Sequence, residues 1–258
     1  MKIVVCVKIT PDAGDIEARP DGSISLEKAE WTIGGLDLQA VEAAVQLAEV
    51  TSSQVIALSA GPSPVGSSKL RKDLLSRGPD ELVLVVDEAL GGADTAATAA
   101  VLAAAVRKIG GADLVLAGEG SADLYFQQVG LQLGERLDLP TLNAVTRIAL
   151  EGDHLLVERT LEDAVEVLEA PLPAVLSLAA EVNQPRLPTM KMILMAGKKP
   201  VTQWSLADLG ISSPLEESIQ VISTQAPPRR QRKQVVITGA AGEAAAALAG
   251  YLGKEGII

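Results

Sequence analysis

Short apolar runs alternate with segments of helical periodicity along the first half of this chain, and this alternation limits the folds it can adopt. Four apolar runs have the length of buried strands, at residues 2–7, 54–59, 82–86 and 113–117. Each is followed by a segment with helical spacing, at residues 36–50, 67–77, 94–109 and 125–137. We therefore expect an α/β fold with a doubly wound, mostly parallel sheet that is covered by helices on both faces.

The pattern changes after about residue 140. Three strands joined by short turns are predicted at residues 146–150, 154–159 and 165–169, with a hairpin turn at Glu151-Gly152-Asp153. A further strand is predicted at residues 172–178. Residues 200–233 show weak periodicity, which is typical of an extended arm, and a last strand and helix are predicted at residues 235–238 and 243–252. The fold should thus carry an added β-hairpin region and a C-terminal arm.

Composition sets limits on the core and on the partners. Apolar residues make up 48% of the 258 residues but aromatic residues only 2%, so Ala, Val and Leu must fill the core. The net charge of −11 argues against nucleic acid as a partner. A single cysteine excludes an internal disulfide and suits a cytoplasmic protein. We expect neither a signal peptide nor a membrane span, because the apolar runs are too short.

Small or polar segments follow three of the predicted strands, where ligands of parallel sheets bind. They are Cys6-Val7-Lys8, Ala60-Gly61-Pro62 and the loop from Gly118 to Asp123. That loop reads Gly118-Glu119-Gly120-Ser121-Ala122-Asp123 and lacks the third glycine of a dinucleotide fingerprint, which argues against a conventional NAD site. Backbone N–H groups near Gln127, Gln128 and Val129 can hold a phosphate. A plain turn is the alternative, and the Glu119 and Asp123 carboxylates weigh slightly against phosphate.

Two other glycine-containing segments precede predicted helices. Gly61 and Gly66 have the spacing of a phosphate-binding P-loop, but no lysine follows, so a turn that opens a helix is favoured. Gly34 and Gly35 precede the first helix, with Asp37 as its predicted N-cap. Paired glycines either let a backbone approach a ligand closely or form a flexible loop end, and the residues leave both readings open.

Catalytic and metal sites find little support. His154 is the one histidine and lies in a predicted hairpin, so a structural role is favoured over a catalytic triad. One histidine and one cysteine cannot form a Cys/His metal cluster, and Cys6 lies in a buried strand where it packs as a small hydrophobe.

Two segments near the C-terminus favour protein contacts. Residues 189–195 contain three of the four methionines, which suit either an adaptable contact or core filling. The basic run at residues 227–233 favours a solvated tether or a contact with an acidic partner.

Nearly the whole chain resembles the β subunit of electron transfer flavoproteins, and within this family the Fix-type branch linked to carnitine metabolism or nitrogen fixation. The passages that carry the resemblance lie at residues 7–44, 68–82, 118–130, 158–178 and 183–201. The last of them, NQPRLPTMKMILMAGKKPV, corresponds to the signature region of the family.

The resemblance implies an electron carrier rather than an enzyme. Its β subunit forms a heterodimer with an α subunit that binds most of the FAD. The pair accepts electrons from a flavin dehydrogenase, of the acyl-CoA or carnitine-related kind, and passes them to a quinone-linked acceptor. On this basis residues 1–185 are expected to form the nucleotide-binding domain, and residues 186–258 the recognition loop and the arm that contacts the α subunit.

The resemblance also implies a nucleotide in this chain, either a structural AMP or a second FAD in electron-bifurcating members that oxidise NADH. The positions that match the family's site are Cys6, Gly34, Gly35, Leu36, Asp37, Ala60, Gly118, Glu119, Gly120, Ser121, Asp123, Gln127, Gln128 and Val129. Leu124, Tyr125 and Phe126 depart from the family pattern and put bulky side chains into the loop. A nucleotide-binding regulatory protein of the same fold, without a redox partner, is the alternative from another class.

The signature region of the family includes a recognition loop, whose apolar side chain docks into the partner dehydrogenase. Met190 falls at that anchor position, where leucine is more usual.

Overall fold

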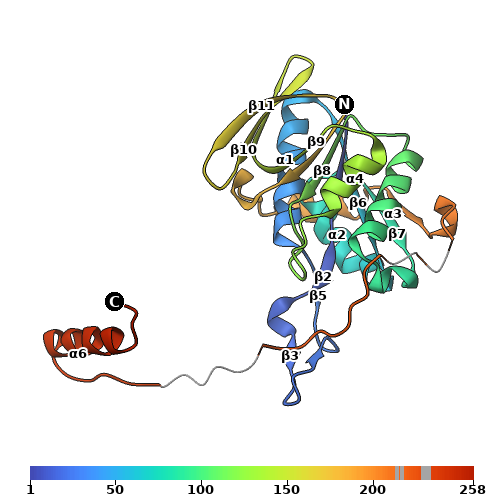
Figure 1. Ribbon diagram of the computed structural model, residues 1–258. Coiled ribbons are helices and arrows are strands. Elements are labelled where there is room, and N and C mark those ends of the chain that lie inside the picture. Colours follow the sequence, from blue (N-terminus) through green and yellow to red (C-terminus); the bar gives the residue numbers. More distant parts are fainter. Residues whose placement is uncertain (213–214, 216–217, 228–233) are drawn as a thin grey trace.

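A nine-stranded sheet forms the centre of the computed structural model, which describes residues 1–212, 215, 218–227 and 234–258 (Figure 1). Its strands are β1 (Lys2–Cys6), β6 (Gln54–Gly61), β7 (Glu81–Val86), β8 (Leu114–Gly118), β9 (Thr141–Glu151), β10 (His154–Thr160), β11 (Val165–Pro171), β12 (Ala174–Leu178) and β13 (Val201–Trp204). Their order across the sheet is β11-β10-β9-β12-β8-β1-β6-β7-β13.

Most of this sheet is parallel, as the sequence predicts. The neighbouring strands from β9 to β13 in this order all pair in parallel, while β10 runs antiparallel to both β9 and β11. The β9–β10 turn lies at the predicted position, because residues 151 and 154 close the hairpin. The added β-hairpin region is therefore a continuation of the main sheet rather than a separate layer.

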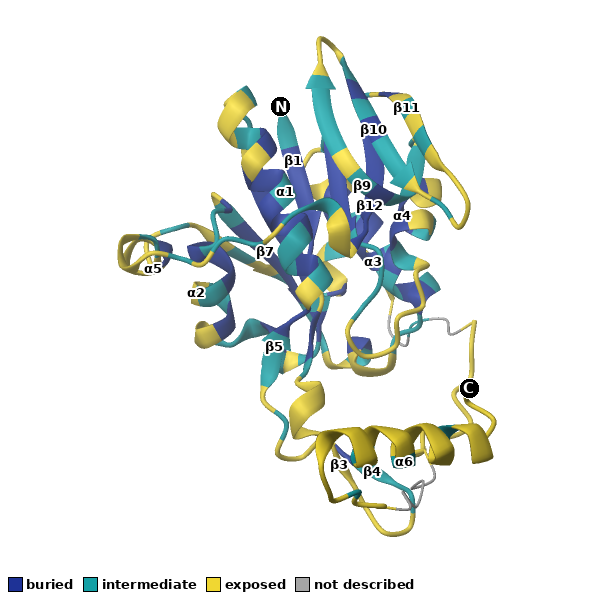
Figure 2. Cartoon of the chain, turned by 90° about the vertical axis from the view of Figure 1, so that its left-hand side faces the viewer, coloured by how far each residue is buried: buried dark blue, intermediate teal, exposed yellow. Residues whose placement is uncertain are grey.

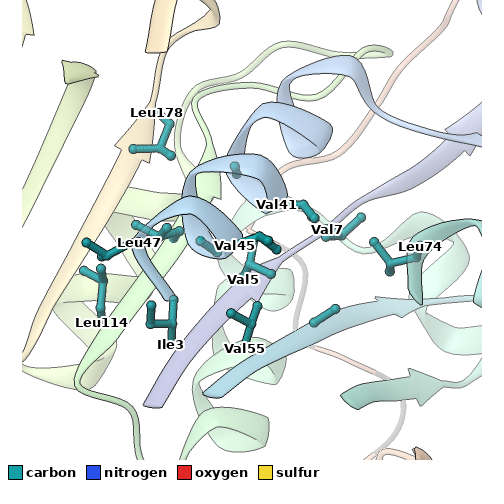
Figure 3. Close-up of a cluster of buried hydrophobic side chains, with 14 of the residues drawn as sticks. Ile3, Val5, Val7, Val41, Val45, Leu47, Val55, Leu74, Leu114 and Leu178 are labelled. Carbon is teal, nitrogen blue, oxygen red and sulfur yellow. The ribbon is translucent and has the colours of Figure 1, made fainter. Parts of the chain in front are cut away.

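Helices cover both faces, so the doubly wound prediction is confirmed. On one face lie α1 (Gly35–Thr51) and α2 (Ser68–Ser76), whose apolar side chains pack on β1, β6 and β8. Figure 3 shows this core, where Val45 of α1 lies beside Val5 of β1 and Val41 beside Val7. On the other face lie α3 (Thr95–Lys108) and α4 (Val129–Leu137), which bury a second apolar cluster. Burial on both sides explains why the central strands read as unbroken apolar runs.

Two helices begin elsewhere than predicted. The N-cap of α1 is Gly34, not Asp37, because the Leu38 N–H already donates to the Gly34 carbonyl and Asp37 is turned inward in the first turn. The second case is α4, which begins at Val129 instead of residue 125. Tyr125 and Gln127 both have positive φ angles, of 50° and 56°, and this left-handed backbone cannot continue a right-handed helix.

Smaller elements project from the carboxyl edge of the sheet. Two small sheets follow β1: β2 (Ile9–Pro11) pairs with β5 (Trp31–Ile33), and β3 (Glu17–Ala18) pairs with β4 (Ile24–Ser25). Short 3-10 helices lie at Ala13–Asp15, Ser63–Gly66, Glu88–Gly92, Ala180–Val182 and Ala207–Leu209. Two outer helices, α5 (Met190–Ala196) and α6 (Ala241–Lys254), complete the structure.

The C-terminal region corrects two further predictions. Residues 201–204 do not belong to an extended arm, because β13 pairs with β7 and Leu206 is buried beside it. Residues 235–238 are not a strand, since they pair with no strand among the described residues and Val236 is largely exposed. The predicted helix is present as α6, which has no buried residue and lies apart from the sheet (Figure 2). Of the predicted basic run, residues 228–233 lie outside the described residues.

One close approach ties the end of β8 to the start of α1. A Cβ added to Gly118 would lie 2.9 Å from the backbone carbonyl carbon of Leu36 and 3.1 Å from the backbone nitrogen of Asp37. Backbone atoms cannot rotate away as a side chain can, so only glycine fits without moving the helix.

Gly118→Ala should therefore lower the free energy of unfolding by about 1–3 kcal/mol, as overpacking does in other cores. Urea denaturation of the purified chain measures this. Gly92→Ala is the matched control, because nothing lies within 4 Å of its added Cβ. Equal stability of the two variants would contradict the close approach.

Candidate functional site

The strand order reverses next to β1, and this reversal places the candidate site. The chain runs from β1 to β6 and β7 on one side, and then crosses to β8 on the other side of β1. Ligands of doubly wound sheets bind outside the carboxyl ends of the strands at such a switch point. The segments that follow β1 and β8 are those that begin at Cys6 and Gly118.

An ion pair joins these two segments directly. The Lys8 Nζ lies 2.8 Å from both carboxylate oxygens of Asp123 and 3.4 Å from the Ser121 hydroxyl. Burial by itself raises the pKa of the Asp123 carboxyl, but the Lys8 ammonium and the Ser121 hydroxyl outweigh it and hold that pKa below its usual value. Lys8 was not among the predicted site residues, although a lysine directly after a buried strand is a visible signal.

Asp37 is the most unusual titratable group at this edge. Its side chain is only 6% exposed, and its Oδ2 atom has no hydrogen-bond partner within the described residues. Burial raises the pKa of this carboxyl to about 8, against the smaller opposing effects of the Lys8 backbone N–H and the Lys8 charge. A Cβ on Gly34 would overlap this carboxyl group. Near pH 7 the group is therefore mostly protonated and able to donate a hydrogen bond.

Cys6 lies beside this carboxyl group at the end of β1. It is buried and pairs with Leu58 of β6 and Ala117 of β8 across the sheet. Burial, and then the charge of Asp37, raise the pKa of the Cys6 thiol to about 12. The thiol is thus protonated at neutral pH and packs as an apolar side chain, which does not suit a nucleophile.

The loop after β8 folds back on itself. The Tyr125 ring covers Gly120, where an added Cβ would lie 2.7 Å from the Tyr125 Cε2 atom. The Tyr125 hydroxyl donates to the Glu119 carboxylate. Leu124 and Phe126, the other bulky residues of this loop, are about half exposed. The two carboxylates of the loop thus have partners, Lys8 for Asp123 and Tyr125 for Glu119.

The other predicted site residues near this loop differ in their hydrogen bonds and in their burial. Gln128 is the N-cap of α4 but provides no side-chain cap; its Oε1 atom accepts a hydrogen bond from the Thr95 hydroxyl at 2.8 Å. The first N–H groups of α4 therefore keep their hydrogen-bonding capacity for another acceptor. Gln127 is exposed, Val129 is partly buried, and Ala60 packs in β6 against the core beneath α3.

Leu36 and Gly35 belong to the first turn of α1, next to Gly118, so the structure brings this turn to the same edge. Met190 lies elsewhere, on α5, and 72% of its surface is exposed.

The described residues meet the requirements of neither a metal site nor a membrane-spanning helix. In residues 1–212, 215, 218–227 and 234–258, no three His, Cys, Asp or Glu side chains gather where they could hold a metal ion. None of the helices in this described part of the chain has both the length and the apolar character needed to cross a bilayer.

The raised pKa of Asp37 predicts a pH-dependent stability. Between pH 3.8 and about 8 the folded chain holds a proton that the unfolded chain releases, so the free energy of unfolding falls as pH rises. The maximal slope is about 1.4 kcal/mol per pH unit for one proton. Asp37→Asn should remove this slope, and should gain stability over the wild type as pH increases. Urea denaturation at about pH 5 and about pH 9 measures the difference.

Asp123→Asn is the matched control for that measurement. The lowered pKa of Asp123 gives a contribution that is present above pH 3.8 and lost as pH falls through the folded-state value, so it stays constant between about pH 5 and about pH 9. A stability difference between Asp37→Asn and wild type that does not change with pH would contradict the protonated state of Asp37.

A comparison with known protein families finds a match over most of the chain. Residues 22–209 match the family model described as the electron transfer flavoprotein domain. The match covers well over half of the chain, including α1, the loop after β8 and α5. The chain therefore belongs to the electron transfer flavoprotein domain family, a family of electron-transfer proteins.

Proposed function

We propose that this chain is the β subunit of a heterodimeric electron transfer flavoprotein of the Fix type, and that it binds an AMP at the switch point of its sheet. The observation that carries the proposal is the joining of the β1 and β8 segments by Lys8, Asp123 and Ser121, beside the buried Asp37 carboxyl. Nucleotides bind at this place in doubly wound sheets.

The charges at this edge suit a phosphate better than the sequence indicates. Asp123 is neutralised by Lys8, Glu119 accepts the Tyr125 hydroxyl, and Asp37 is mostly uncharged near pH 7. The uncapped first turn of α4 offers backbone N–H groups, which favour an anion through the helix dipole. Ser121 and Asp37 supply polar atoms for the sugar or base. AMP would act as a structural ligand and would not react.

The redox chemistry belongs to FAD, which we place mainly in the partner subunit. Bound there, the flavin accepts electrons from a dehydrogenase and releases them to a quinone-linked acceptor. This chain then cradles the partner, and its contribution is binding and orientation. The raised pKa of Cys6, which keeps its thiol protonated, supports a role in binding and orientation for this strand end.

The exposed apolar side chains of α5 support a docking role for residues 187–198. Met190, Leu194 and Leu187 are 72%, 69% and 87% exposed, which is costly unless a partner covers them. Met190 is the proposed anchor that enters an apolar pocket of the dehydrogenase.

The nucleotide content tests the first part of the proposal. We expect one FAD and one AMP per heterodimer when the chain is purified with its FAD-bearing partner and the nucleotides are released with acid. Lys8→Met should reduce the AMP content, because Asp123 then loses its counter-charge, while Lys69→Met, which breaks an exposed ion pair, should not. Two FAD and no AMP would instead support a bifurcating member that oxidises NADH. Absence of any flavin would support a regulatory protein without a redox partner.

Truncation of the anchor tests the docking role. Met190→Ala should lower kcat/KM for electron transfer from an acyl-CoA dehydrogenase by about ten-fold, because truncation of an important interface side chain costs more than about 1 kcal/mol, with unchanged flavin content. Val50→Ala is the control, since Val50 is 80% exposed at the end of α1. Unchanged transfer in Met190→Ala would refute the anchor role.

A further inference from the structure

The segment that leads into α5 is attached to α1 by one arginine. The Arg186 Nε and Nη2 atoms donate to the two carboxylate oxygens of Glu42 at 2.8 and 3.0 Å. The Nη1 and Nη2 atoms donate to Glu49 at 2.6 and 3.2 Å, and the Arg186 backbone N–H donates to Glu42 at 3.1 Å. The planar guanidinium thus holds two carboxylates that lie about two turns apart on α1, which a lysine cannot reproduce.

Burial makes this contact more than a surface ion pair. Glu42 is 4% exposed, and a buried carboxylate is tolerated only when it is paired and hydrogen-bonded. Burial raises the pKa of Glu42, but the hydrogen bonds from Arg186 and Gln46 outweigh it and hold that pKa below its usual value. The carboxylate therefore stays charged and keeps Arg186 in place.

Neighbouring amides extend the attachment along α1. The Asn183 Nδ2 atom donates to the Gln39 carbonyl at 2.9 Å, and the Gln39 side chain donates to the Ala180 carbonyl at 2.5 Å. Residues 180–186 thus lie along α1 over about two turns before the chain leaves it.

A second attachment lies beyond α5. The Lys199 Nζ donates to the carbonyl oxygens of Leu75, Gly78 and Pro79 at 3.0, 3.1 and 2.6 Å. These carbonyls lie at and after the C-terminal end of α2, where a cation is favoured. Two residues later β13 enters the sheet, so this end is also fixed.

Between the two attachments, residues 187–198 bury few side chains. Ala196 is the only buried residue among residues 187–198, and α5 has seven residues, too few for a helix to be stable alone. Figure 2 shows α5 beside α2 with its surface mainly exposed. Its contact with the rest of the fold is with α2, through the buried Ala196. The orientation of its apolar side chains therefore depends on this contact and on the attachments at the two ends of the segment.

We infer that Arg186 is a positioning residue, which fixes residues 187–198 so that the exposed apolar side chains of α5 are presented in one orientation to a partner protein. The effect of Arg186 on docking rests on the docking function proposed above, whereas its attachment to α1 does not. A segment ordered before binding spares the complex the entropy of ordering it afterwards. Loss of the attachment should therefore weaken docking without altering the chemistry after docking.

Arg186→Lys tests this inference in the heterodimer with the FAD-bearing partner. It keeps the positive charge next to Glu42 but cannot bridge both carboxylates. We expect amide hydrogen exchange in residues 190–196 to speed up by about ten-fold, with exchange in the core of α1 unchanged. We expect the KM of an acyl-CoA dehydrogenase for the heterodimer, its electron acceptor, to rise by about ten-fold at constant kcat.

Two further variants keep the result interpretable. The double variant Glu42→Gln with Arg186→Gln removes the charges together, so it avoids an unpaired buried carboxylate, and should behave like Arg186→Lys. Lys69→Met, which breaks the exposed pair with Glu30, should change neither readout.

The possible outcomes distinguish the positioning of α5 by Arg186 from the docking function of α5. Unchanged exchange at residues 190–196 in both Arg186 variants would overturn the positioning role. Faster exchange there, with KM unaffected by Arg186→Lys and by Met190→Ala alike, would support the positioning of α5 and refute its docking function. Faster exchange with an unchanged KM in the Arg186 variants, but an increased KM in Met190→Ala, would overturn the role of Arg186 in docking.

Discussion

The crossover that places β8 on the far side of β1 is the constraint on which the polar part of this structure depends. Parallel strands bury both faces, so polar groups can gather only at the strand ends. At the switch point the segments after β1 and β8 lead to helices on opposite faces of the sheet, α1 and α4. Lys8 and Asp123 meet there, although 115 residues separate them in the chain.

Glycine and burial then decide the chemistry of this edge. Gly118 lets the end of β8 touch the first turn of α1, and Gly34 leaves room for the Asp37 carboxyl. The same close packing removes water from Asp37 and raises its pKa, so a residue that is an anion in solution becomes mostly neutral near pH 7. An edge that carries three carboxyl groups can in this way still suit an anionic ligand.

Sequence reasoning succeeded where the local pattern and the tertiary environment agree. The central strands and the helices α1, α2 and α3 were predicted to within a few residues, because unbroken apolar runs and helical spacing reflect burial directly. It failed where they disagree. The half-exposed strand β13 has polar residues in its sequence, and the start of α4 is displaced by left-handed backbone at Tyr125 and Gln127. Residues 235–238 resemble a strand but pair with no strand in the part of the chain that the structure describes.

The sequence by itself determined the fold class, the family and the segments that reach the carboxyl edge, since these follow from periodicity and from extended similarity. Only the tertiary structure decided that Asp37 is a buried carboxyl rather than a helix cap, and that Lys8 pairs with Asp123. It alone showed that Arg186 is held by Glu42 and Glu49. Each pairing depends on which residues far apart in the chain the fold brings close together, and the charge states of Asp37 and Glu42 depend also on their burial. A charged residue in the sequence does not indicate which partner it will meet.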